Sequence, residues 1–82
     1  MKDRHVLVEE LRDLILGRLV PLDDDELVNS ASLVDEVLDS LGIAEVAVFI
    51  EDEIGRPLDA DEEVRSTFAS VDAVVDFIIA RR

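Results

Sequence analysis

Apolar side chains recur at steps of three and four residues in three separate stretches of the chain, and this spacing constrains the fold most. An amphipathic helix buries such a stripe, because one turn takes about 3.6 residues. The stripes are Val6 or Leu7, Leu11, Leu14 and Ile15 or Leu16; then Ile43, Val46, Ala47, Ile50 and Ile54; and finally Val71, Val74, Val75 and Ile78. No alternating run bounded by hairpin turns predicts a strand. We therefore predict an all-α fold with these residues in its core.

Capping and stop residues set the bounds of the predicted helices. Asp and Ser are favoured at the N-cap, whereas Gly and Pro end helices. The predicted helices cover residues 3–17, 39 to about 55, 61–66 and 70–82. A chain of 82 residues makes one domain, spanning positions 1–82. The prediction is thus a four-helix bundle with a short third helix.

A long connection, residues 18–39, separates the first two predicted helices. It contains Pro21 and the acidic run 23–26. Its apolar residues should pin it across the bundle, and they are Leu22, Leu27, Val28, Leu33, Val34 and Val37. Loops of this length in compact domains are often functional. The acidic run lacks the Gly and the final Glu of a calcium-binding EF-hand loop, so we expect no metal there.

The charge balance is strongly acidic. The chain carries 21 acidic and 8 basic residues, a formal net charge of −13. Binding phosphate groups requires Lys and Arg, so we expect neither nucleic acid nor an anionic membrane as a partner. We expect instead a protein with a basic patch, drawn in by the field of the acidic groups.

Residues suited to catalysis or metal binding are scarce. The chain has no cysteine, which excludes disulfides, thiolate metal sites and cysteine nucleophiles. The single histidine, His5, has no catalytic partner in its sequence context. No stretch is apolar enough to span a bilayer, and the N-terminus has no signal-peptide core. We therefore expect a cytoplasmic protein that is a monomer and not an enzyme, with no catalytic or metal-binding residues.

Ser40 is the residue that the sequence singles out for chemistry. A Ser in the first turn of a helix exposes its hydroxyl beside unpaired backbone N–H groups, where a phosphate is favoured. The helix that follows has a second stripe, apolar and acidic, that we expect to dock a partner. Its predicted docking residues are Leu41, Ala44, Glu45, Val48, Glu51 and Asp52.

Asp39-Ser40-Leu41 opens an acidic helix after a long loop, with Glu45 four positions beyond Leu41. Further landmarks follow downstream: Ile54, Pro57-Leu58, an acidic short segment, Ser70-Val71 and Asp76-Phe77-Ile78. With this order of features, the chain resembles a stand-alone member of the acyl carrier protein family over nearly its whole length.

The resemblance implies a function and a set of partners. Ser40, flanked by Asp39 and Leu41, would bear a covalent 4′-phosphopantetheine arm whose thiol carries an acyl group as a thioester. The implied partners are a phosphopantetheinyl transferase, an acyl- or aminoacyl-activating ligase, and condensing or transferase enzymes with basic docking patches. The implied pathways are specialised ones of the polyketide, fatty acyl or nonribosomal peptide type. Asp39 stands where peptidyl carriers usually have His or Gly, which favours acyl cargo, although aminoacyl cargo stays open. The alternative is an acidic helical interaction module that is never modified.

Overall fold

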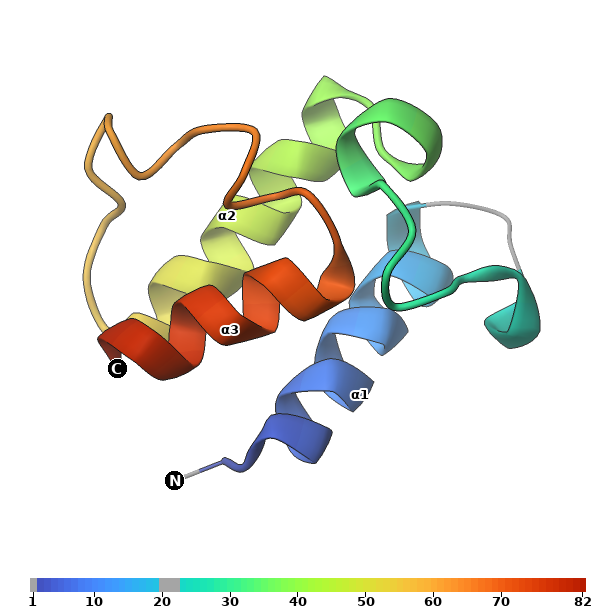
Figure 1. Cartoon of the computed structure of the whole chain (residues 1–82), viewed down its shortest axis with the longest axis horizontal. Coiled ribbons are helices and arrows are strands. Elements are labelled where there is room, and N and C mark those ends of the chain that lie inside the picture. The colour runs from blue at the N-terminus through green and yellow to red at the C-terminus, as the bar shows by residue number, and fades with distance from the viewer. Residues whose placement is uncertain (1, 20–22) are drawn as a thin grey trace.

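The computed structural model describes residues 2–19 and 23–82, and these form helices and turns without any strand. Three α-helices contribute most of the fold, namely α1 (Arg4–Leu14), α2 (Ser40–Ile54) and α3 (Val71–Arg81). Helix α3 contacts both α1 and α2 (Figure 1). The predicted all-α fold is confirmed. Within the same residues, no helix has the length and apolar character needed to cross a membrane.

Each α-helix begins at a side-chain cap that the sequence provides. The Asp3 carboxylate accepts a hydrogen bond from the Val6 amide at 2.9 Å, and the Ser70 hydroxyl accepts one from the Ala73 amide at 3.0 Å. Helix α2 ends at Gly55, whose φ of 77° lies in the left-handed region that glycine adopts without strain. Pairing the free N–H groups of the first turn stabilises each helix by about 1 kcal/mol.

The core collects one stripe from each helix. Its fully buried members are Leu7, Leu11, Ile15, Leu33, Val46, Ile50, Val71, Val74, Val75 and Ile78. Between the alternatives in the first stripe, Leu7 and Ile15 are the buried residues, while Val6 is exposed. Ile43, Ala47 and Ile54 are half-buried and pack against this core, so their predicted place in it is confirmed only in part.

The connection between α1 and α2 is held onto the bundle, as its apolar residues predict. It contains the π-helical turns η1 (Ile15–Leu19) and η3 (Leu33–Val37) and the 3-10 turn η2 (Asp24–Glu26). Among its described residues, the buried ones are Ile15, Leu27, Leu33 and Leu38. Val34 and Val37 are half-buried, whereas Val28 is 55% exposed, so the expectation that Val28 pins the loop is wrong. Leu22 and Pro21 lie outside the described residues.

The short helix predicted over residues 61–66 is absent, and this prediction is wrong. Residues 59–68, called the strap below, form successive turns between α2 and α3 (Figure 1). The Glu62 amide donates to the Asp59 carbonyl at 2.9 Å, and the Thr67 amide donates to the Val64 carbonyl at 3.0 Å. Seven of the eight side chains in 59–66 are exposed, so the segment lacks the buried stripe that stabilises a short helix.

Candidate functional site

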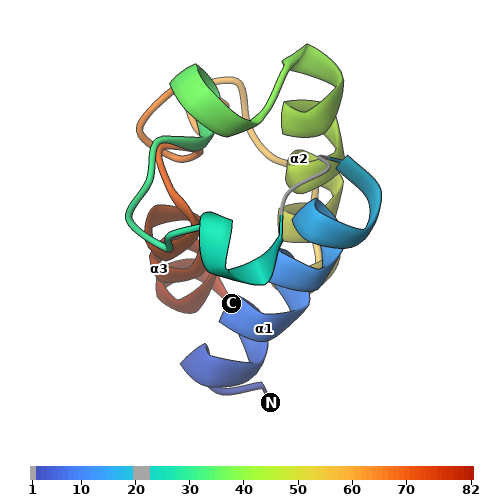
Figure 2. The same ribbon diagram turned by 90° about the vertical axis from the view of Figure 1, so that its right-hand side faces the viewer.

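Ser40 lies at the first position of α2 with its side chain exposed. The preceding residue, Asp39, is the N-cap, and its Oδ1 accepts a hydrogen bond from the Gly42 amide at 2.9 Å. The Ser40 hydroxyl has no hydrogen-bond partner among the atoms that the structure describes. Figures 1 and 2 place this end of α2 far from both chain termini. A modifying enzyme can therefore approach the hydroxyl without displacing an internal contact.

The chain before Ser40 is folded tightly against α2. The Leu38 amide donates to the Leu33 carbonyl at 2.7 Å, which closes η3 just ahead of the cap. Leu38 is buried and lies over the first turn of α2. A Cβ on Gly42 would be 3.0 Å from Leu38 Cδ2 and 3.2 Å from Leu38 Cβ, so a larger residue here would require Leu38 to shift. Asp39 and Ser40 thus follow a segment with one well-defined path.

The loop is also tied to α1 and to the start of α3. The Leu33 amide donates to the Ala69 carbonyl at 3.0 Å, and the Asp72 amide donates to the Asn29 carbonyl at 3.1 Å. The guanidinium of Arg12, on α1, donates to the Asn29 side chain at 2.6 Å and to the Leu27 carbonyl. These bonds place residues 27–33, and through η3 they place Ser40.

An apolar pocket of about 500 Å³ opens beside Ser40, between α2 and the strap. Its lining residues are Val34, Ser40, Ile43, Ala44, Ala47, Val48, Glu51, Glu63, Val64, Arg65 and Phe68. A second hollow of about 420 Å³ is lined by Val34, Leu38, Asp39, Ser40 and Ile43. The half-buried Ile43 and Ala47, predicted as core, also form pocket wall. The first pocket has the size and apolar character of a small-ligand site.

The predicted docking residues fall into two groups in the structure. Leu41 is 71% exposed and Val48 is 53% exposed, and Ala44 and Asp52 are exposed as well. Glu45 and Glu51 are half-buried. The Glu51 carboxylate accepts a hydrogen bond from the Leu58 amide at 2.8 Å, so it also anchors the chain just before the strap. Sequence reasoning missed this anchoring contact, because nothing local links positions 51 and 58.

The exposed face of α2 is acidic. Residues 40–54 contain four carboxylates and neither Lys nor Arg. Lys2 reaches the last turn of the helix, where its Nζ lies 2.9 Å from Glu53 and 2.7 Å from Glu10. Hydrogen bonds to Glu10 and Glu53 raise the pKa of Lys2. This cation lies at the end of α2 opposite Ser40, whereas Arg65 of the strap lines the pocket beside Ser40.

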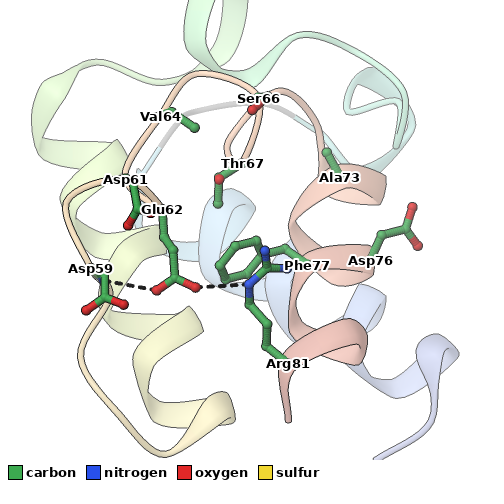
Figure 3. A pocket seen from close by; sticks show the side chains of 10 residues that line it. All are labelled: Asp59, Asp61, Glu62, Val64, Ser66, Thr67, Ala73, Asp76, Phe77 and Arg81. Carbon is green, nitrogen blue, oxygen red and sulfur yellow. Dashed lines mark hydrogen bonds and ion pairs between the residues drawn. The ribbon is translucent and has the colours of Figure 1, made fainter.

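A third hollow, which is polar and has a volume of about 610 Å³, lies between the strap and α3 (Figure 3). At its centre, Glu62 accepts hydrogen bonds from Arg56 at 2.7 and 2.9 Å and from Arg81 Nε at 3.0 Å. The Arg56 hydrogen bonds, followed by one from the Asp59 amide, lower the pKa of Glu62 to about 2. The Arg81 guanidinium also lies 3.8 Å from the centroid of the Phe77 ring. The name Glu62 cluster refers below to Arg56, Glu62, Phe77 and Arg81. The sequence alone did not point to this cluster.

The remaining candidates for chemistry are dispersed. His5 lies exposed on α1. In the acidic run, the Asp23 amide donates to the Glu26 carboxylate at 3.0 Å, so Glu26 serves to close η2. Across residues 2–19 and 23–82, no three His, Cys, Asp or Glu side chains gather in a way that would hold a metal ion.

Comparisons with known proteins do not identify a family for this chain. A scan against protein-family models finds no match, and a search of curated proteins finds none either.

Proposed function

We propose that this chain is a carrier protein that bears 4′-phosphopantetheine on Ser40 and presents an acyl thioester to biosynthetic enzymes. The observation that carries the proposal is the exposed Ser40 hydroxyl at the first position of α2, next to an apolar pocket. The chain itself forms and breaks no bond of the cargo. It supplies the attachment point, the docking face and the nearby pocket.

The residues around Ser40 fit a phosphodiester. Ser40 Oγ would form the new P–O bond, the pyrophosphate bond of coenzyme A would break with release of adenosine 3′,5′-bisphosphate, and the Ser40 proton would pass to a base of the transferase. The product phosphate would then lie at the N-terminal end of a 15-residue helix, where the dipole favours negative charge. The Asp39 carboxylate accepts a hydrogen bond from the Gly42 amide, and this N-cap fixes the start of the helix. When bound, the arm supplies a thiol, which this chain lacks.

The pocket beside Ser40 favours apolar cargo. Its wall is formed mostly by aliphatic side chains and Phe68, together with Glu51, Glu63 and Arg65, and Ser40 lines it as well. Each methylene of a tethered chain that enters it would be stabilised by about 0.8 kcal/mol. We therefore propose acyl cargo in preference to aminoacyl cargo.

The proposed function also concerns the predicted short third helix of a four-helix bundle. We propose that the strap is the counterpart, in this chain, of the short third helix of a four-helix carrier bundle. It lies between α2 and α3 in the chain, and it forms one wall of the pocket. The implied partners are a phosphopantetheinyl transferase, an activating ligase, and condensing or transferase enzymes with basic patches that match the acidic face of α2.

Intact mass measurement tests the proposal. The purified chain is incubated with coenzyme A and a broad-specificity phosphopantetheinyl transferase, and the mass should rise by one arm. Ser40→Ala should show no gain while keeping its helicity. Ser66→Ala, which removes an exposed Ser in the strap, should be modified like the wild-type chain. A folded wild-type chain that gains no mass would favour the alternative, an unmodified acidic interaction module.

A further inference from the structure

The strap buries few of its side chains. Its last two residues, Thr67 and Phe68, are buried, and Leu58 just before it is buried too. Between these ends, Glu62 is the one side chain of residues 59–66 that is not exposed. A segment with so few buried contacts belongs to the part of a protein that opens most readily.

Glu62 ties the middle of the strap to two other parts of the fold. Arg56, which follows α2, forms a two-pronged ion pair with both carboxylate oxygens of Glu62. Arg81, in the last turn of α3, donates to the same carboxylate and is itself held over the Phe77 ring. Figure 3 shows the Glu62 side chain reaching from the strap toward Arg81 across the polar hollow. Two-pronged, charge-assisted contacts of this kind fix both distance and orientation.

The strap separates two hollows. Val64 lines both the apolar pocket of about 500 Å³ on the α2 side and the polar hollow of about 610 Å³ on the α3 side. A shift of the strap toward α3 would therefore enlarge the apolar pocket, and open space exists on that side to receive it. The Glu62 cluster borders the hollow on the α3 side and sets the position of the strap between the two.

We propose that the Glu62 cluster is a latch that holds the strap in place and so controls how readily an apolar chain enters and leaves the pocket beside Ser40. The identity of that chain, an acyl group tethered to Ser40, rests on the function proposed above. Glu62 is a positioning residue in this scheme, because it acts through the strap and does not line the apolar pocket. Breaking the latch should speed exchange of the pocket's occupant.

The test uses the unmodified chain and an uncharged apolar dye, N-phenyl-1-naphthylamine, which the acidic surface does not repel. Glu62→Gln removes the ion pairs, and Asp61→Asn removes one charge from an exposed neighbouring side chain that does not line the apolar pocket. Stopped-flow fluorescence should show the dye leaving Glu62→Gln several-fold faster than Asp61→Asn. Equal dissociation rates for the two variants would overturn the proposal.

Amide hydrogen exchange separates a latch from general destabilisation. The Thr67 and Phe68 amides, which close turns of the strap, should exchange several-fold faster in Glu62→Gln, while the Leu11 amide in α1 should not change. Equal acceleration at Leu11 would show a merely structural role and overturn the proposal. Should Glu62→Gln lose helical circular dichroism, Arg56→Lys replaces it, because it keeps the charge but removes the two-pronged geometry.

The latch and the carrier function can fail separately. A chain that gains the arm but shows identical dye and exchange kinetics in the two variants would retain its function and lose the latch. A chain that is never modified, yet shows the predicted difference between the variants, would retain a latched apolar pocket and lose the carrier function.

Discussion

Gly42 lies where the chain before Ser40 comes closest to α2. A Cβ at this position would be 3.0 Å from Leu38 Cδ2 and 3.2 Å from Leu38 Cβ, and Leu38 is buried. Overpacking of this kind costs about 1–3 kcal/mol, against a gain of about 1 kcal/mol for replacing Gly by Ala inside a helix. We predict that Gly42→Ala lowers the free energy of unfolding by about 1 kcal/mol, measured by urea denaturation.

Gly17 provides the matched control for this prediction. A Cβ there would meet no atom within 4 Å, and Gly17 is exposed in η1. Gly17→Ala should therefore be neutral or stabilise the fold by about 0.5 kcal/mol. A Gly42→Ala chain at least as stable as Gly17→Ala would show that the approach of Leu38 does not require a glycine.

The pKa of Glu62, lowered to about 2, predicts a pH-dependent contribution to stability. A carboxylate whose pKa is depressed by folding stabilises the native state fully above its unfolded pKa, about 4.3. That contribution is lost as the pH falls from about 4.3 toward 2. We predict that the difference in urea midpoint between wild type and Glu62→Gln is largest at pH 7 and shrinks steadily below about pH 4.3.

Glu63→Gln serves as the reference in the same titration, since it removes a charge from an exposed residue of the strap. Its midpoint should stay closer to that of wild type at neutral pH. If the difference in urea midpoint between wild type and Glu62→Gln were constant from pH 7 to pH 3, the ion pairs with Arg56 and Arg81 would contribute nothing to stability in solution.

Helix α2 would combine the attachment site, one pocket wall and an acidic docking face under the proposed function. Its side chains divide by position, with Ser40 at the first turn, Ile43 and Ala47 toward the pocket, and Leu41 and Asp52 toward solvent. Ala44 and Val48 are exposed and also line the pocket, so partner binding and cargo binding would share residues on this helix.

The acidic face predicts a defect in partner recognition when its charge is reversed. Glu45→Lys should lower kcat/KM for modification by the transferase about tenfold, because surface charges at an interface act mainly on the association rate. Added salt should reduce the difference from wild type. Asp25→Lys makes the same change in net charge in exposed η2 and should have little effect. Equal losses in both variants would show that only net charge matters.

The elements that local signals define were predictable from the sequence. Helix α2 begins beside Asp39 and ends at Gly55, because an N-cap and a left-handed glycine act within one turn of the residues concerned. The strap was not predictable, because Glu62 is held by Arg56 and Arg81, which are 6 and 19 residues away in the chain. The pocket was missed for a similar reason: the spacing of Ile43 and Ala47 marks a face of α2 but not whether another segment fills the space beside it.

At the scale of the whole molecule, several basic groups gather near the C-terminal end of α2. Lys2 pairs with Glu53 near the end of α2, Arg82 donates to the Lys2 carbonyl, and Arg56 and Arg81 meet at Glu62. Ser40 lies at the other end of the helix, away from both termini (Figure 1). Under the proposed function, Glu45 and Asp52 on α2 would help to orient a basic partner.

The net charge of −13 also predicts a salt effect on stability. Self-repulsion among carboxylates opposes folding, whereas exposed ion pairs contribute about 0–1 kcal/mol each. Screening should therefore stabilise the fold on balance, and we predict that the Tm rises by about 5 °C between low salt and about 0.5 M NaCl. A Tm that falls with salt would show that the intramolecular ion pairs outweigh the repulsion.

The mass of the protein purified from its own cells tests the central claim most directly. The account predicts that the 9.1 kDa chain is heavier than its sequence by one 4′-phosphopantetheine, with or without an acyl group, and that fragmentation releases the arm from the peptide containing Ser40. A chain that is recovered folded and carries only the mass of its sequence, or that carries the arm on another residue, would contradict it.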